Sequence, residues 1–267
     1  MPRTPVHVTV WEDGGAGKPT ALFVHNVITW GDDAAYGFAA QRPLAAHARL
    51  LLMDRRGYGR SPEVERGDYA VDAEDIVALL GDGAHLVGHG YGGVGALLAA
   101  SRRPDLVRSL TLIQPGALRV AADHPVVAEA LERARQGVAD LPQDLPPGEF
   151  LRASTEGLGL AMPEPTPERL RAARTSMRER PCWDADIPLR PIADAPWPVL
   201  LVSGDWAGAP ELYRRYAGEP LIACAETIAE TVGARHLRVP GFYPHTQQPE
   251  RVNEALRQLW READGGG

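Results

Sequence analysis

The chain has 267 residues, 44% of them hydrophobic, which is enough to bury one sizeable core. Its formal net charge of −7 at pH 7 argues against a nucleic-acid partner, because nucleic-acid binding depends on basic patches. No apolar run approaches the roughly 18 residues of a membrane span, and the N-terminus lacks the layout of a signal peptide. We therefore expect a cytoplasmic protein with no membrane partner.

The predicted elements alternate along the chain between buried strands and helices. Residues 20–26 are typical of a short buried strand, and residues 50–61 continue a second strand into a glycine-rich turn. Residues 72–80 have apolar side chains at helical spacing and carboxylates in the first turn, where the helix dipole favours them. Further strands are predicted at 109–114, 199–204 and 235–239, and further helices at 223–232 and 249–260. Buried runs of this kind predict an α/β fold with a mostly parallel sheet.

The turn within residues 86–93 is the most informative segment. Its sequence Gly88-His89-Gly90-Tyr91-Gly92 matches the pattern G-x-S-x-G, in which a serine lies on a sharp strand-to-helix turn, with Gly90 in the serine's place. Glycine reaches positive φ without a Cβ clash and so suits this strained turn, but it has no side chain that could attack a carbonyl. An ordinary glycine-rich turn or a phosphate-binding loop is the alternative interpretation.

Residues 118–190 differ from the rest of the chain. Buried strand-like runs disappear, prolines recur, and stretches rich in Ala, Glu, Arg and Leu predict three or four short helices. We therefore divide the chain into a core, residues 1–117 and 191–267, and a helical insertion, residues 118–190.

From about Val6 to Trp260 the chain resembles the α/β-hydrolase superfamily. Asp54 to Ser61 is similar to the family's D-x-R-G-x-G-x-S turn, and His25-Asn26 stands where the family usually has His-Gly. The resemblance implies an α/β-hydrolase fold, a mostly parallel sheet flanked by helices, with the insertion forming a helical cap after the sixth strand.

The resemblance also implies positions for the catalytic groups. The backbone N–H groups of Val27 and Tyr91 would form the oxyanion site, where two donors stabilise negative charge. The nucleophile position holds Gly90, the acid position holds Ala207, and alignment through Pro249-Glu250 places Phe242 at the histidine position. We therefore expect none of the usual triad and no serine-type hydrolysis.

His245 is the alternative to a lost histidine, because it matches a second histidine often seen in the family. A one-residue loop shift would let it serve as the base. His25 and His89 match positions where active members of the family also carry histidine, so a structural role is the alternative for both.

Aromatic and polar side chains near these positions are predicted to bind a large apolar or peptide-like ligand. The predicted substrate-binding residues are His25, Asn26, Trp30, His89, Gly90, Tyr91, Gln114, Trp183, Trp206, Phe242, Tyr243 and His245. Cys182 and Cys224 lie far apart in sequence and form no CxxC pair, so neither a disulfide framework nor a zinc site is indicated. We expect no metal and no cofactor.

Three functions fit an altered triad. The one we favour is a non-hydrolytic isomerase, epimerase or cyclase that acts on a peptide or natural-product intermediate with substrate-assisted acid–base chemistry. In this respect the chain resembles the α/β-hydrolase-fold peptide epimerase of bottromycin-type biosynthesis. The second function is ligand binding without catalysis, and the third is hydrolysis by relocated catalytic residues. The expected partner is a small-molecule or modified-peptide substrate, and the expected state is a monomer or dimer.

Overall fold

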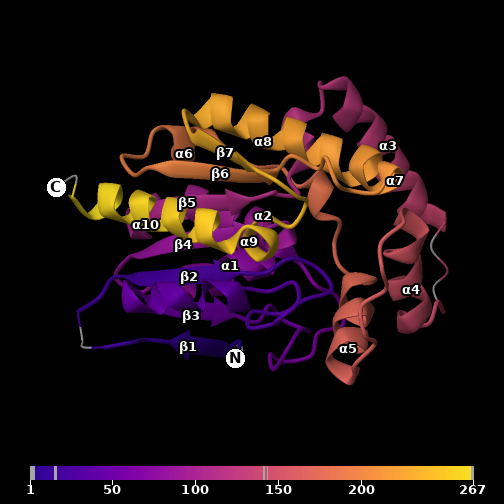
Figure 1. Ribbon diagram of the computed structural model, residues 1–267, viewed down its shortest axis with the longest axis horizontal. Helices are drawn as coiled ribbons and strands as arrows, with labels where there is room; N and C mark the ends of the chain where they lie inside the picture. The colour runs from indigo at the N-terminus through magenta and orange to yellow at the C-terminus, as the bar shows by residue number, and fades with distance from the viewer. Residues whose placement is uncertain (1–3, 15–16, 141, 143, 266–267) are drawn as a thin grey trace.

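A sheet of seven strands runs through the middle of the molecule, with helices on both faces (Figure 1). The computed structural model describes residues 4–14, 17–140, 142 and 144–265, so the outermost residues of the predicted core lie outside the described residues. The strands are β1 (Val8–Trp11), β2 (Thr20–Val24), β3 (Arg49–Met53), β4 (Ala84–His89), β5 (Val107–Ile113), β6 (Val199–Gly204) and β7 (Arg235–Val239).

The order of the strands across the sheet is β1-β3-β2-β4-β5-β6-β7. β1 pairs with β3 in the antiparallel sense, and the other pairs are parallel. This arrangement confirms the predicted α/β architecture with a mostly parallel sheet.

The helices fall into those that cover the sheet and those that lie beyond its end. The α-helices are α1 (Tyr69–Leu79), α2 (Tyr91–Arg102), α3 (Pro125–Asp140), α4 (Pro147–Ala153), α5 (Pro167–Ser176), α6 (Arg190–Ala193), α7 (Glu211–Tyr213), α8 (Glu219–Val232), α9 (Pro244–Gln247) and α10 (Pro249–Gly265). Short 3-10 helices include η1 (Ala39–Ala46), η3 (Leu118–Ala121), η4 (Glu156–Leu158) and η5 (Cys182–Asp184). In the described part of the chain, no helix has the length and apolar character that crossing a membrane requires.

Two hydrophobic clusters pack against the two faces of the sheet. Successive residues of a strand point to opposite faces, so Leu22 and Val24 of β2 pack with α1, α2 and α8. Ala21 and Phe23 of the same strand belong to the cluster made with η1 and α10. Because its central strands are covered on both faces, the sheet holds the carboxyl ends of its parallel strands in fixed relative positions.

Most predicted elements are present, with shifted ends. β6 and β7 have the predicted boundaries, whereas α1 begins at Tyr69 rather than at residue 72. It begins early because the side chain of Asp68 accepts a hydrogen bond from Ala70 N and caps the helix. β1 and η1 were not predicted.

Residues 118–190 contain helices and, among the described residues, no strand. They follow β5, the fifth strand in chain order. The prediction counted this strand as the sixth, and the difference arises because β1 is the one described strand that precedes β2. The division of the chain into core and cap stays a prediction. We call residues 118–190 the cap.

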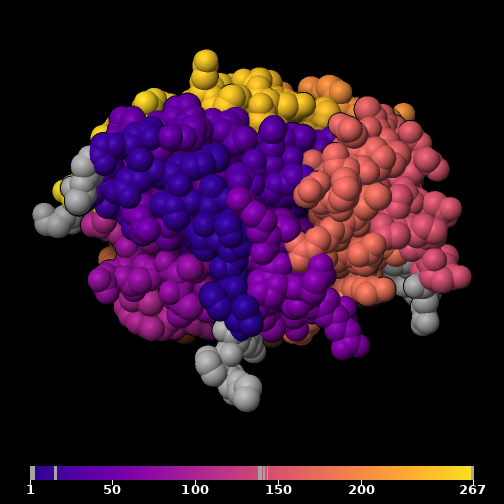
Figure 2. Space-filling view, turned by 90° about the horizontal axis from the view of Figure 1, so that it is seen from below, coloured from indigo at the N-terminus to yellow at the C-terminus, as the bar shows by residue number. Residues whose placement is uncertain are grey.

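Buried ion pairs hold the cap against the core. Arg169 of α5 pairs with Asp33 at 2.7 Å, and Glu179 pairs with Arg55 at 2.6 Å. Arg55 also pairs with Asp72 of α1 at 3.0 Å. Figure 2 shows the salmon-coloured part of the cap lying directly against the purple part of the core. The cap therefore covers the carboxyl ends of the parallel strands.

Candidate functional site

The turn between β4 and α2 has the backbone of a nucleophile elbow. Gly90 lies between the strand and the helix with φ 53° and ψ −114°, a conformation that L side chains rarely adopt. Two residues later, a Cβ on Gly92 would lie 2.4 Å from the carbonyl oxygen of Val24, so the helix can approach β2 because residue 92 has no side chain. The predicted interpretation of the glycine pattern as an elbow therefore agrees with the backbone.

The side chain of Asn26 fills the space above Gly90. A Cβ built on Gly90 would lie 2.2 Å from both Cγ and Oδ1 of Asn26. Tyr91 N donates a hydrogen bond to Asn26 Oδ1 at 2.9 Å. Because a backbone N–H must face an acceptor, the amide oxygen points at Tyr91 and Nδ2 points elsewhere.

This contact corrects the predicted oxyanion site. Tyr91 N–H was expected to be free for a ligand, but Asn26 already accepts its hydrogen bond. Val27 N has no hydrogen-bond partner among the described residues and Val27 lines both cavities, but its role as an oxyanion donor stays a prediction. The neighbouring Ile28 N donates to Ser176 Oγ of α5 at 3.0 Å, which ties this loop to the cap.

Two cavities meet at the elbow. We call the first the aromatic cavity, of about 520 Å³, and the second the arginine cavity, of about 850 Å³. The aromatic cavity is lined by Asn26, Val27, Ile28, Thr29, Tyr36, His89, Phe150, Ser154, Thr155, Leu160, Ala161, Pro163, Tyr213, Phe242, Tyr243 and Gln247. The arginine cavity is lined by Val27, Tyr91, Phe150, Ser176, Glu179, Cys182, Trp183 and four arginines, Arg66, Arg174, Arg178 and Arg180, with further residues of α3, α4 and the segment between them.

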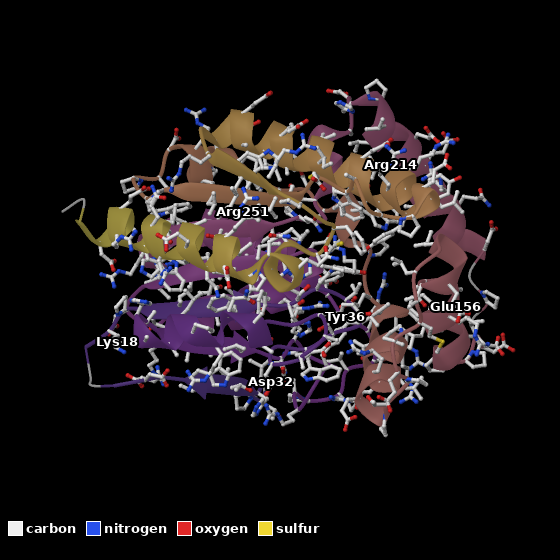
Figure 3. All side chains as sticks on the ribbon, in the orientation of Figure 1. Lys18, Asp32, Tyr36, Glu156, Arg214 and Arg251 are labelled. Carbon is white, nitrogen blue, oxygen red and sulfur yellow. The ribbon has the colours of Figure 1, made fainter. Side chains whose placement is uncertain are left out.

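Packed rings form one wall of the aromatic cavity. Tyr213 of α7 packs on Phe242 with ring centroids 5.9 Å apart, and Tyr36 packs edge-on against Tyr243 at 5.4 Å. Tyr213 OH donates to Tyr243 OH at 3.2 Å. Figure 3 shows Tyr36 between the end of the sheet and the cap. No charged side chain belongs to the described lining of this cavity, which therefore suits an apolar group.

His89 is the one imidazole in the described lining of either cavity. His89 lines the aromatic cavity although it is only 4% exposed, and its Nδ1 is buried with no hydrogen-bond partner among the described residues. Burial, and then the neighbouring His245 and His25, hold the pKa of His89 well below 6.5. The ring is therefore neutral at neutral pH and can accept a proton.

His245 and His25 lie behind this lining. His245 is fully buried, its ring centroid is 4.4 Å from that of His89, and its Nε2 donates to Tyr36 O at 3.2 Å. Burial lowers the pKa of His245 to about 4. His25 donates from Nδ1 to Asn26 O at 2.6 Å and accepts from Arg55 N at Nε2. Both histidines have structural bonds, which favours the structural alternative and argues against His245 as a relocated base.

Six of the predicted substrate-binding residues have side chains or positions in the described cavity linings: Asn26, His89, Phe242 and Tyr243 in the aromatic cavity, and Tyr91 and Trp183 in the arginine cavity. The other six, His25, Trp30, Gly90, Gln114, Trp206 and His245, line neither cavity. The two cavities do not support contact of these six residues with a substrate, and such contact stays a prediction.

Packing explains why Trp206 and Gln114 are not in the lining. Trp206 is 1% exposed and lies beneath Tyr213 and Phe242, with ring centroids 4.9 and 6.1 Å away. Gln114 accepts from Gly204 N and donates from Nε2 to Phe242 O, so it links two strand ends to the loop after β7. Trp30 lies under the guanidinium of Arg169 at 4.7 Å.

The loops at the predicted acid and histidine positions are held by side chains. Asp205 Oδ1 accepts from Ala207 N at 3.1 Å and from Gly241 N at 3.0 Å, which is a structural role. Gln247 Oε1 accepts from Phe242 N and Tyr243 N. Sequence reasoning missed Gln247 and Tyr213. The signal for Gln247 was its place four residues after Tyr243, which caps the start of the short helix that Gln247 ends, whereas Tyr213 had no motif.

Neither cysteine has the properties of a nucleophile. Cys182 lies close to the elbow, since a Cβ on Gly116 would be 3.0 Å from its Sγ, and Gly116 N donates to Gly90 O. Burial raises the pKa of Cys182, and likewise that of Cys224, to about 12, so both are thiols at neutral pH. Within the described residues, no group of three or more His, Cys, Asp or Glu side chains could hold a metal ion.

A sequence model described as the Alpha/beta hydrolase family matches residues 21–255 of the chain. The pimeloyl-[acyl-carrier protein] methyl ester esterase of Aeromonas salmonicida is 34% identical over 107 residues, which are 39% of this chain and 41% of that protein. The 2-(acetamidomethylene)succinate hydrolase of Mesorhizobium japonicum is 35% identical over 104 residues, which are 37% of this chain and 36% of that protein. The chain thus spans about two fifths of the length of the curated relatives it matches.

Among solved structures, a thermophilic esterase from Thermogutta terrifontis has a TM-score of 0.66 at 20% identity, covering 97% of this chain and 93% of that chain. Likenesses at this identity show the fold, and the predicted α/β-hydrolase fold is confirmed. Both of these relatives and this solved structure are named as esterases or hydrolases. They contradict the predicted isomerase or epimerase activity, which is wrong, and they give no support to a likeness with a bottromycin-type epimerase.

Proposed function

The chain belongs to the alpha/beta hydrolase family, and from this premise we propose that it hydrolyses esters or related acyl compounds with water as the nucleophile. The observation that carries the proposal is the Asn26 amide seated above Gly90, in the lining of the same cavity as His89. The proposal corresponds to the third of the three functions considered from the sequence, hydrolysis by relocated catalytic residues.

His89 is the proposed general base. A base must be unprotonated to accept a proton from water, and the lowered pKa of His89 keeps its ring neutral at neutral pH. The other titratable side chains in the described lining of the aromatic cavity are the tyrosines Tyr36, Tyr213 and Tyr243, and burial raises the pKa of Tyr213 and Tyr243 above 10. His89 is therefore the group best suited to activate water in this cavity.

Asn26 is the proposed stabiliser of negative charge. Its Oδ1 accepts the hydrogen bond from Tyr91 N, at the positive end of α2. Its Nδ2 has no hydrogen-bond partner among the described residues, and Asn26 lines the aromatic cavity. Side-chain amides serve as oxyanion donors in other hydrolases, where the loss of one such donor costs about 10²–10³ in kcat. The N–H of Val27 would be a second donor.

The proposed reaction has two steps. Water transfers a proton to His89 Nε2 while its oxygen bonds to the carbonyl carbon, and the carbonyl oxygen becomes an oxyanion beside Asn26 Nδ2. The bond from that carbon to the leaving group then breaks, and the leaving oxygen takes the proton from His89. No bond to a protein side chain forms, so no acyl-enzyme accumulates.

The substrate class follows from the relatives and from the cavity. The relatives are named for hydrolysis of a methyl ester and of 2-(acetamidomethylene)succinate, which supports a small-molecule acyl substrate for this chain. The aromatic rings of the cavity support an apolar group on one side of the scissile bond.

Ligand binding without turnover is the second candidate. It is favoured by one observation, the hydrogen bond from Tyr91 N–H to Asn26, which occupies a donor that hydrolases of this family leave for the substrate. A binding protein would be stabilised by its ligand and would return it unchanged.

The first test is a panel of p-nitrophenyl esters, from acetate to benzoate, with the variant Asn26→Asp. This change keeps the acceptor for Tyr91 N–H but replaces the Nδ2 donor with an oxygen that repels an oxyanion. We expect kcat to fall by about 10²–10³ with little change in KM. Asn253→Asp is the matched control, because Asn253 is also largely buried but lines neither cavity. Its kcat should be unchanged.

The second test is the pH profile and His89→Gln. A base must lose its proton to act, so kcat/KM should fall as the pH drops through the lowered pKa of His89, below 6.5, and stay level above it. In His89→Gln this limb should vanish along with most of the activity. No hydrolysis of any ester, together with a rise in Tm with an unhydrolysed compound, would reject turnover and support the binding role. A covalent acyl adduct in the intact protein would reject direct attack by water.

A further inference from the structure

The arginine cavity is the larger of the two cavities, and the proposed reaction uses none of its charged side chains. Four arginines belong to its described lining: Arg66 from the loop before α1, Arg174 from α5, and Arg178 and Arg180 from the segment after α5. All four side chains are exposed, so they lie where the cavity opens to solvent. The lining brings together arginines from both core and cap.

Three of these arginines have no acidic partner within the described part of the chain. No ion pair is formed by Arg66, Arg174 or Arg178 with a described residue, although the chain as a whole is acidic, with a net charge of −7. Arg180 lies 3.5 Å from Asp68 and over the ring of Tyr69 at 4.5 Å, so its position is fixed.

The carboxylates of the same cavity do not neutralise these arginines. Glu179 points to Arg55, 2.6 Å away, and both side chains are buried. Asp144 is the other carboxylate in the described lining, and it forms no ion pair with a described residue. The cavity therefore keeps an excess of positive charge, in contrast to the aromatic cavity, whose described lining has no charged side chain.

The two cavities share part of their lining. Val27 and Phe150 belong to both. The residues on either side of Gly90 divide between them, because His89 lines the aromatic cavity and Tyr91 the arginine cavity. A ligand whose reacting group lies at Asn26 and His89 can therefore extend into the arginine cavity past the elbow.

We propose that the arginine cavity binds an anionic group, a carboxylate or a phosphate, carried by the substrate on the far side of the scissile bond from its apolar part. The guanidinium fork matches the two oxygens of either group, and such charge-assisted bonds are among the stronger ones in proteins. In calling the ligand a substrate, this inference rests on the proposed function.

The test measures binding and needs no turnover. The probes are 4-phenylbutanol, 4-phenylbutyrate and 4-phenylbutyl phosphate, which share an apolar part and differ in charge. Isothermal titration of the full chain should show that one or both anions bind about tenfold or more tightly than the alcohol, less so at high salt. The tighter of the two anions identifies the group that the cavity prefers.

The variant Arg174→Gln/Arg178→Gln should reduce this preference to about twofold or less while affinity for the alcohol stays the same. Arg251→Gln is the matched control: Arg251 is exposed, forms no ion pair with a described residue, and lies on α10 outside both cavities (Figure 3). Equal binding of the three probes, binding of none, or a preference that survives in the double variant would overturn the inference. If the protein binds the anionic probes more tightly than the alcohol but hydrolyses no ester, the result would support this inference and contradict the proposed function.

Discussion

The aromatic cavity and the arginine cavity meet at one turn, but different forces shape them. The aromatic cavity is bounded by rings from α7 and the loop after β7 that pack on a buried tryptophan. The arginine cavity lies under a cap segment held by ion pairs such as Glu179–Arg55. Packing of rings depends little on pH or salt, whereas buried ion pairs depend on the protonation of their members. The first cavity should keep its shape across conditions, and the second should respond to them.

The largest expected effect tests the packed side of this comparison. Trp206→Ala removes the ring beneath Tyr213 and Phe242 and should destabilise the fold by about 3–5 kcal/mol, as expected for a buried large-to-small change. Affinity for apolar ligands should fall as well. Trp183→Ala, in the partly exposed lining of the arginine cavity, should cost less than about 2 kcal/mol. Urea unfolding measures both, and equal costs for the two variants would contradict the comparison.

The next effect tests the ionic side. Burial raises the pKa of Glu179 from 4.5 to about 7, despite the opposing effect of Arg55. A carboxyl whose pKa is higher in the folded protein favours the protonated form. The contribution of Glu179 to the free energy of unfolding is therefore fully present below pH 4.5 and falls as the pH rises to 7, by up to about 3 kcal/mol.

Glu179→Gln removes this titration, so the unfolding free energy of the variant relative to the wild-type chain should rise with pH in that range. Other buried groups should keep their slopes in both proteins: Asp72, whose pKa burial raises, in the same direction as Glu179, and His89 and His245, whose pKa burial lowers, in the opposite direction. The measurement is urea unfolding at pH 4.5, 5.5 and 7.5, compared with the wild-type chain. An unchanged slope in the variant would show that Glu179 is not the titrating group.

A smaller effect concerns the turn between the cavities. Gly90→Ser adds a side chain at positive φ and into the space of Asn26, so we expect a loss of about 1–3 kcal/mol in stability and no gain of esterase activity. Gly208→Ser is the control, because a Cβ at Gly208 meets no atom within 4 Å. Ester turnover in Gly90→Ser above that of the wild-type chain, with an acyl adduct on the new serine, would contradict the assignment of Ala207 and Phe242 to the other triad positions.

The smallest effect concerns one hydrogen bond of the aromatic cavity. Tyr213→Phe removes the bond from Tyr213 OH to Tyr243 OH but keeps the ring, so it should cost about 1 kcal/mol and leave binding of apolar ligands nearly unchanged. Thermal unfolding and titration with 4-phenylbutanol measure the two quantities. A large loss of binding would show that the hydroxyl pair, rather than the rings, holds the cavity.

The sequence predicts the buried parts of the fold better than its edges. The buried strand β6 has the predicted boundaries because its apolar run is bounded by turn-forming residues. The edge strand β7 also has the predicted boundaries, although it is polar and only partly buried. β1 was missed because it is a short edge strand with partly exposed residues and no clear alternation of burial. The glycine motif led correctly to the elbow, since such a turn restricts residue type at several consecutive positions.

The site was harder to predict because it depends on where loops direct their side chains. Trp206 and Gln114 have φ of 59° and 45°, and both side chains are buried. Tryptophan and glutamine rarely adopt positive φ, so their residue types do not predict this backbone conformation. The sequence shows that Asn26 and Gly90 both differ from the family pattern, which has glycine at the first position and serine at the second. That they fill one space follows from residues 64 positions apart meeting in the fold.

The contact between Asn26 and Gly90 also constrains how this protein could have evolved. Because the amide occupies the place of a side chain at residue 90, a mutation to serine meets an obstacle that it would not meet in a relative with glycine at residue 26. A side chain at residue 90 therefore requires the Asn26 amide to turn away and to give up its hydrogen bond with Tyr91 N. We expect the effects of substitutions at the two positions to be epistatic.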